Sequence, residues 1–123
     1  MNLIDSSGWL EYLTDGSLAD EYSVHLAEPA EVLTPTVVLF EVYKWVRRER
    51  SEEEALIVAA QLQKTELVPL NPTIALNAAD IGLEHGLAMA DSIVYTTALT
   101  HDVPLITSDR DFESLPGVVL LER

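Results

Sequence analysis

The chain lacks cysteine altogether, which excludes disulfide bonds, zinc–thiolate sites and cysteine nucleophiles. It also lacks long apolar runs: the longest, residues 55–60, falls far short of the roughly 20 residues that span a bilayer. The amino-terminal residues contain no basic stretch and reach an acid at Asp5, so they do not resemble a signal peptide. We therefore expect one cytoplasmic domain over residues 1–123, with no membrane segment.

Positive charge is scarce as well. Seven Lys and Arg residues stand against 21 Asp and Glu, a formal net charge of −14 with histidine neutral. This excess argues against a broad nucleic-acid-binding surface, because phosphate contacts come from Lys and Arg. Four of the seven cations lie within residues 44–50, where they can form a local cationic strip. The acidity is compatible with a salty habitat or with a basic partner, and composition does not choose between them.

Apolar residues are plentiful, at 48% of the chain, which excludes intrinsic disorder despite the charge. Short apolar runs, which predict strands, lie at 2–5, 31–34, 66–70, 103–107 and 118–121. Helical spacing predicts helices at 9–13, 18–26, 35–50, 51–65, 71–86 and 89–100. Strands and helices thus alternate, which predicts an α/β fold with a parallel sheet covered by helices on both faces.

Helix-end signals support these boundaries. Ser6 to Gly8 offer caps for the first helix, and Thr34 followed by Pro35 predicts a helix whose first residue is the proline. Ser51 and Asn71 are typical caps of the next helices. The helix that begins after Asn71 is predicted to end at Gly86 in a left-handed conformation.

Acids occupy the places where a parallel sheet binds ligands, outside the carboxyl ends of its strands. Asp5 ends the first strand, Asp109 and Asp111 follow the fourth, and Asp91 begins the helix before it. Taken singly, each has an ordinary explanation: Asp5 as a helix cap, Asp91 as an acid favoured by the helix dipole, the other two as loop acids. Glu41 lies two turns into the helix that follows the second strand.

Glu41 is the most informative of these acids, because it lies in an apolar helical stretch where an unpaired carboxylate is costly to bury. It can pair with Lys44 or Arg48 on its own helix. Asp5 and Asp91, however, also lie in apolar surroundings without a nearby cation in sequence. Three acids short of partners suggest one shared cation, and ligation by oxygen alone suits Mg²⁺ or Mn²⁺.

With these motifs in order along nearly the whole chain, the sequence resembles a PIN domain, and more narrowly the VapC-type toxins of toxin–antitoxin pairs. The segments that carry the resemblance are 5–9, 34–42, 90–98 and 105–112. The resemblance implies a three-layer fold with about five parallel strands and a Mg²⁺- or Mn²⁺-dependent endoribonuclease. The chain departs from the family in its acidity and in Tyr95 and Thr96, where small residues are more usual.

The resemblance also implies roles for particular residues. The catalytic and metal-ligating acids would be Asp5, Glu41, Asp91 and Asp109. Asp111 shares or takes the role of the fourth acid, while Ser7 and Thr107 match hydroxyl positions common in the family. No histidine is required, and we expect structural or surface roles for His25, His85 and His101.

Substrate phosphates need cations beside these acids. Lys44 and Arg48 follow Glu41 by three and seven residues and share its helix face, whereas Arg47 and Arg50 are predicted to point the other way. Lys44 and Arg48 can equally neutralise acids of this same protein. The candidate substrate-binding cations are Lys44, Arg48 and Arg110.

Family resemblance implies two protein partners in addition to an RNA substrate. One is a small basic antitoxin that inserts an Arg or Lys among the carboxylates. The other is a second copy of the chain, for which Tyr43 or Leu56 could supply exposed apolar contacts. An acidic module that holds a basic peptide without cutting anything is the main alternative. A receiver-type phosphoacceptor domain fits poorly, because one Asp rather than a pair ends the first strand and no Lys follows Lys64.

Overall fold

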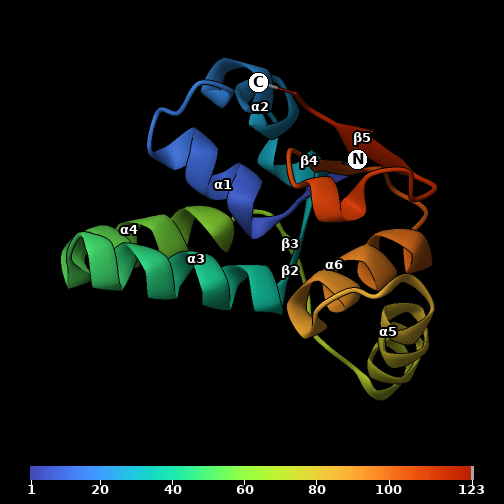
Figure 1. Ribbon diagram of the computed structural model, residues 1–123. Coiled ribbons are helices and arrows are strands. Elements are labelled where there is room, and N and C mark those ends of the chain that lie inside the picture. The colour runs from blue at the N-terminus through green and yellow to red at the C-terminus, as the bar shows by residue number, and fades with distance from the viewer. Residues whose placement is uncertain (123) are drawn as a thin grey trace.

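A five-stranded parallel sheet lies between two layers of helices in the computed structural model, which describes residues 1–122 (Figure 1). The strands are β1 (Asn2–Ile4), β2 (Val32–Pro35), β3 (Glu66–Val68), β4 (Leu105–Thr107) and β5 (Val118–Leu120). The helices are α1 (Ser6–Leu13), α2 (Ala19–Leu26), α3 (Thr36–Glu49), α4 (Glu52–Leu62), α5 (Pro72–His85) and α6 (Met89–Thr100), with short 3₁₀ turns η1 (Pro29–Glu31) and η2 (Arg110–Phe112). The predicted three-layer α/β fold is confirmed.

The strand order β3-β2-β1-β4-β5 explains how the two layers arise. From β1 the chain moves outward to β2 and β3, and the right-handed connections place α1 to α4 on one face. It then crosses to the other side of β1, so that α5 and α6 cover the opposite face (Figure 1). The direction of winding therefore reverses between β1 and β4, which makes the carboxyl ends of these two strands the point where a ligand is expected.

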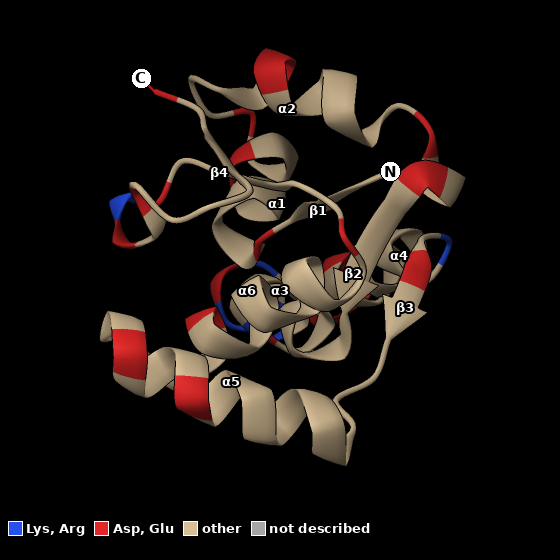
Figure 2. Cartoon of the chain, turned by 90° about the vertical axis from the view of Figure 1, so that its right-hand side faces the viewer, with Lys and Arg blue, Asp and Glu red and all other residues tan. Residues whose placement is uncertain are grey.

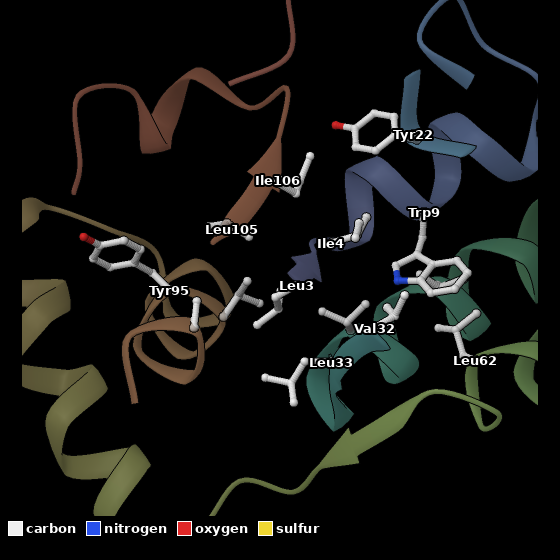
Figure 3. Packing of buried hydrophobic residues seen from close by; sticks show 14 of the residues in the cluster. Leu3, Ile4, Trp9, Tyr22, Val32, Leu33, Leu62, Tyr95, Leu105 and Ile106 are labelled. Carbon is white, nitrogen blue, oxygen red and sulfur yellow. The ribbon is translucent and has the colours of Figure 1, made fainter. Parts of the chain in front are cut away.

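Alternating side chains of the central strands fill the space on both faces of the sheet (Figure 3). Leu3, Leu33 and Leu105 are paired across β1, β2 and β4 and lie toward Tyr95 of α6. Residues of the other face, such as Ile4, lie toward the aromatic side chains of α1 and α2. Because the central strands β1, β2 and β4 have only three or four residues each, burial on both faces is what stabilises them.

Most predicted helix ends are confirmed. The side chains of Ser51 and Asn71 accept hydrogen bonds from the backbone three residues on, and Gly86 ends α5 with φ of 69°. Two predictions were wrong. Pro35 is the last residue of β2 and precedes the first residue of α3, because the buried Thr34 continues the strand instead of capping the helix.

The cap of α1 is the second correction: Asp5, and not a residue of Ser6 to Gly8, occupies the cap position. Gly8 lies so close to α2 that an added Cβ would approach the Tyr22 ring to 2.6 Å. Tyr95, unexpected in this family, is accommodated because its hydroxyl donates to the Pro116 carbonyl oxygen at 2.7 Å. Within residues 1–122, no helix has both the length and the apolar character that a membrane span requires.

Candidate metal centre

Two acids meet where the winding of the sheet reverses. Asp5 directly follows β1, and Asp109 lies two residues beyond the end of β4. The hydroxyl of Thr107 joins them: it donates to Asp5 Oδ2 at 2.7 Å and accepts from the backbone N–H of Asp109 at 3.0 Å. Because β1 and β4 are paired, residues 104 positions apart come to share one hydroxyl. Thr107 is fully buried, so its side chain is held by the packing around it.

Asp5 is the most buried acid of the site, with 5% of its surface exposed. Oδ1 accepts from the backbone N–H of Gly8 at 2.9 Å, and Oδ2 accepts from the hydroxyls of Ser7 at 2.9 Å and Thr107 at 2.7 Å. Burial raises the pKa of Asp5 and the charge of Asp109 raises it further, while these three hydrogen bonds oppose the increase. The carboxylate thus caps α1 and faces the other acids at the same time.

Three further carboxylates form the tightest group. Asp91, in the first turn of α6, lies with Asp109 and Asp111 so that one oxygen of each is within 4.8 Å of the others. Asp109 Oδ1 also accepts from the backbone N–H of Asp111 at 2.9 Å, which sets the turn of η2. The structure therefore places Asp111, predicted as a possible additional acid, beside Asp109 in the group.

Electrostatics connect all five acids. The pKa of Asp91 is raised to about 6, first by burial and then by the charges of Asp109, Asp5, Asp111 and Glu41. None of the ion pairs within residues 1–122 includes any of these acids. Like charges that repel and lack a cationic side chain fit a bound divalent cation, and an all-oxygen donor set is the one that Mg²⁺ or Mn²⁺ prefers.

Glu41 joins the cluster from α3. Ser6 Oγ donates to its Oε1 at 3.0 Å, a hydrogen bond between two side chains 35 residues apart. The alternative pairing on its own helix is not observed. Lys44 Nζ lies 5.6 Å from the centre of the Phe40 ring, and Arg48 pairs with Glu49 at 3.0 Å.

The cations of α3 line a different surface, a groove between α3 and α4 with a volume of about 790 Å³. Its lining is Thr36, Leu39, Phe40, Tyr43, Lys44, Arg47, Arg48, Leu56, Ala59 and Gln63. The prediction that Arg47 points away from Lys44 and Arg48 was wrong, because all three reach this groove. Arg47 pairs with Glu52 at 3.6 Å, which draws its side chain toward the start of α4.

The remaining predicted residues lie at the margins. Arg110 is 66% exposed and pairs with Glu113 at 3.2 Å and Glu122 at 3.7 Å. Figure 2 shows how few basic segments the described chain has: they lie on α3, between α4 and β3, and in η2 after β4, while acidic segments are widespread. His85 is the last residue of α5, and His101 is the carboxyl-terminal cap of α6.

Two side chains near the acids were missed by sequence reasoning. Ser6 was considered only as a helix cap, although its hydroxyl contacts Glu41. Tyr22 is fully buried, its hydroxyl donates to Ser108 Oγ at 3.0 Å, and burial raises its pKa to about 12. No sequence signal identifies either contact, because both join elements that lie far apart in the chain.

Comparison with known proteins agrees with this geometry. The chain belongs to the PIN domain family, which it matches over residues 3–118. It is similar to a toxin–antitoxin complex from Klebsiella pneumoniae, with 25% identity, a TM-score of 0.82 and 100% of both chains covered. The predicted resemblance to VapC-type PIN domains is therefore confirmed.

Two further structures share the fold. VapC20 from Mycobacterium tuberculosis, described as a toxin that cleaves the sarcin–ricin loop, has 14% identity and a TM-score of 0.78 over 100% of both chains. DNA-bound VapBC from Salmonella typhimurium has 15% identity and a TM-score of 0.75, with 99% of this chain and 98% of that one covered. No curated protein sequence matches the chain.

Proposed function

We propose that this chain is a Mg²⁺- or Mn²⁺-dependent endoribonuclease and the toxin of a toxin–antitoxin pair. One observation carries the proposal: five carboxylates gather where the sheet reverses its winding, and no ion pair within residues 1–122 neutralises them. Membership of the PIN domain family and likeness to toxin structures support the same function. A purely structural acid cluster would destabilise the fold and supply nothing in return.

Each acid has a role in this proposal. Asp91, Asp109 and Asp111 offer oxygens close enough to bind one cation, and Asp5 and Glu41 approach from β1 and α3. A bound Mg²⁺ or Mn²⁺ would activate a water molecule for in-line attack on phosphorus and offset the charge of the leaving oxygen. The contribution of the chain is to hold the carboxylates in place, which Ser6, Ser7 and Thr107 do through hydrogen bonds.

RNA that reaches these acids would also contact the cations of the α3–α4 groove. Lys44 is the best candidate, because Arg47, Arg48 and Arg110 are engaged with carboxylates of this chain. Lys44 also lies over Phe40, whose side chain is 61% exposed and offers a ring face to an unpaired base. The other predicted substrate cations, Arg48 and Arg110, would contact phosphate only after their ion pairs open.

We also propose that the chain binds a basic antitoxin. The complexes from Klebsiella pneumoniae and Salmonella typhimurium share this fold, and a basic antitoxin would complement the net charge of −14. An Arg or Lys of the partner would then lie among the carboxylates in place of substrate. We also propose a homodimer, with Tyr43 or Leu56 in the contact, and a cytoplasmic location.

Incubation of the purified chain with structured RNA tests the proposal. Cleavage should require Mg²⁺ or Mn²⁺, stop on addition of EDTA, and fall by more than about a hundredfold in Asp91→Asn, beyond the usual effect of losing an outer-shell contact. Asp80→Asn is the matched control, because Asp80 is exposed on α5 and faces the later turns of α6. Equal cleavage by wild type and Asp91→Asn would indicate contamination and favour the acidic binding module.

A further inference from the structure

The first turn of α1 holds two different acids with two consecutive serines. Ser7 Oγ donates to Asp5 Oδ2 at 2.9 Å, while Ser6 Oγ donates to Glu41 Oε1 at 3.0 Å. The backbone N–H of Gly8 donates to Asp5 Oδ1, so this turn is held by a hydrogen bond that does not depend on either serine hydroxyl. The short segment 5–8 at the end of β1 is thus linked by a hydrogen bond to Glu41 of α3.

Glu41 is one of three acids of the cluster whose carboxylates accept a hydrogen bond from the protein within residues 1–122. Asp109 Oδ1 accepts from the backbone N–H of Asp111, and Asp5 accepts three hydrogen bonds. The longer Glu41 side chain loses more rotamer freedom when it is fixed. Among residues 1–122 its Oε1 is bound by Ser6, and neither Lys44 nor Arg48 pairs with it.

The geometry of this contact leaves the carboxylate available. Ser6 occupies Oε1, and no protein donor within residues 1–122 binds Oε2. A hydroxyl that fixes one oxygen and leaves the second open is the arrangement by which outer-shell groups orient a metal ligand. Because Ser6 directly follows Asp5 in the chain, this hydrogen bond links the Glu41 carboxylate to the residue next to the acid that ends β1.

We propose that Ser6 is a positioning residue, whose hydroxyl orients Glu41 toward the acid cluster and thereby increases the affinity of the cluster for a divalent cation. This inference rests on the proposed metal-dependent function. Ser6 does not itself bind the cation, and its effect passes through Glu41.

Calorimetric titration of the full chain with Mn²⁺ tests the proposal without any substrate. Ser6→Ala should weaken Mn²⁺ binding by about tenfold, and Ser6→Thr should restore it, because threonine keeps the hydroxyl. Ser23→Ala is the matched control: the Ser23 hydroxyl donates to the Asp20 carbonyl oxygen on the exposed side of α2. That variant should bind Mn²⁺ as the wild type does.

A second pair of variants separates positioning from folding. Ser6→Val and Ser6→Thr have the same shape and differ in one hydroxyl, so a loss confined to valine comes from the hydrogen bond. In a Glu41→Ala background, Ser6→Ala should have no further effect on Mn²⁺ affinity, since there is no carboxylate left to orient.

The outcomes that overturn the inference are distinct from those that overturn the function. If the wild type binds Mn²⁺ and Ser6→Ala binds it equally well, Ser6 does not position Glu41 and the proposed function stands. The inference also falls if Ser6→Ala still weakens binding in the Glu41→Ala background. If the wild type itself binds neither Mn²⁺ nor Mg²⁺, the proposed function fails, and this inference fails with it.

Discussion

Two charged regions of this protein are built in opposite ways. At the carboxyl ends of β1 and β4, acids from four parts of the chain converge without a Lys or Arg partner within residues 1–122. In the α3–α4 groove, Arg47 and Arg48 each pair with a glutamate on the same or the following helix. The first region concentrates charge of one sign, and the second cancels it locally.

This difference indicates where function lies. Exposed ion pairs such as Arg48–Glu49 contribute little to stability and are screened by salt. Converging carboxylates lower the stability of the folded state in the absence of a ligand. A cation that binds only the folded state offsets this loss of stability. The four predictions below, in order of decreasing effect, test whether the acid cluster and the groove differ in this manner.

The largest effect should come from removing an acid of the cluster. In a hundredfold excess of Mn²⁺ over its dissociation constant, the wild type should gain about 2.7 kcal/mol in the free energy of unfolding. Asp91→Asn should lose most of this gain. Glu52→Gln removes the carboxylate that pairs with Arg47 of the groove, and this variant should retain all of the gain. Thermal unfolding with and without Mn²⁺ measures both, and an equal gain in the two variants would contradict the comparison.

Removal of the shared hydroxyl should have the next largest effect. Thr107→Val deletes the donor to Asp5 and should weaken Mn²⁺ binding by roughly 10–100-fold. Thr34→Val is a matched control, since Thr34 is equally buried near the end of β2 and bonds to Thr65 at 2.6 Å, away from the acids. Both variants should lose about 1–3 kcal/mol of stability. Calorimetric titration with Mn²⁺ should show weaker binding in Thr107→Val alone. Similar Mn²⁺ affinities in the two variants would refute a role of the Thr107 hydroxyl in the acid cluster.

The pH dependence of the metal-free protein should show a smaller effect. The pKa of Asp91 is about 6 when folded, against its usual 3.8. Between these values the folded state binds the proton more tightly, so stability rises as pH falls from about 6 to about 4. At neutral pH, Asp91→Asn should be more stable than wild type by about 1 kcal/mol, a figure reduced for screening of this half-buried side chain.

That advantage should disappear near pH 4, where wild-type Asp91 is protonated. Denaturant unfolding in EDTA at both pH values measures it, with Asp80→Asn as the control at an exposed site on α5. Parallel pH profiles for wild type and Asp91→Asn would mean that burial and the neighbouring charges do not raise the pKa of Asp91 in the folded protein.

The groove should give the smallest effects. Arg48→Ala breaks an exposed ion pair and should change stability by less than about 1 kcal/mol. Lys44→Ala should reduce the slope of log binding constant against log salt concentration for RNA by about one, the loss of one phosphate contact. It should leave Mn²⁺ affinity unchanged. Lys64→Ala, beyond the end of α4, provides the control. A loss of Mn²⁺ affinity in Lys44→Ala would mean that the groove and the acid cluster do not act as separate regions.

Local signals in the sequence were sufficient for most of the fold. Ser51, Asn71 and Gly86 mark helix ends because a cap depends on the backbone within three or four residues. Pro35 shows the limit of that reasoning: a proline suits both the start of a helix and the end of a strand, and burial of Thr34 in the sheet decides between them.

The candidate site was predictable to a different degree. The acids stand out in sequence because each lies at a strand end or in apolar surroundings. The hydrogen bonds from Ser6 and Thr107 were not predictable, because a hydroxyl can turn to any nearby acceptor. The direction of Arg47 was also mispredicted, since Glu52 on α4 attracts it and helical spacing on α3 alone contains no information about α4.

The order of apolar and polar residues alone determined the α/β class and the identity of the candidate acids, since hydrophobic period and helix capping act over a few residues. Only the tertiary structure decided that Asp111 lies in the tight group, that Asp5 and Asp109 share Thr107, and that Ser6 reaches Glu41. The physical reason is strand pairing. The β1–β4 ladder brings together residues about a hundred positions apart, and no local pattern encodes which side chains will then be in contact.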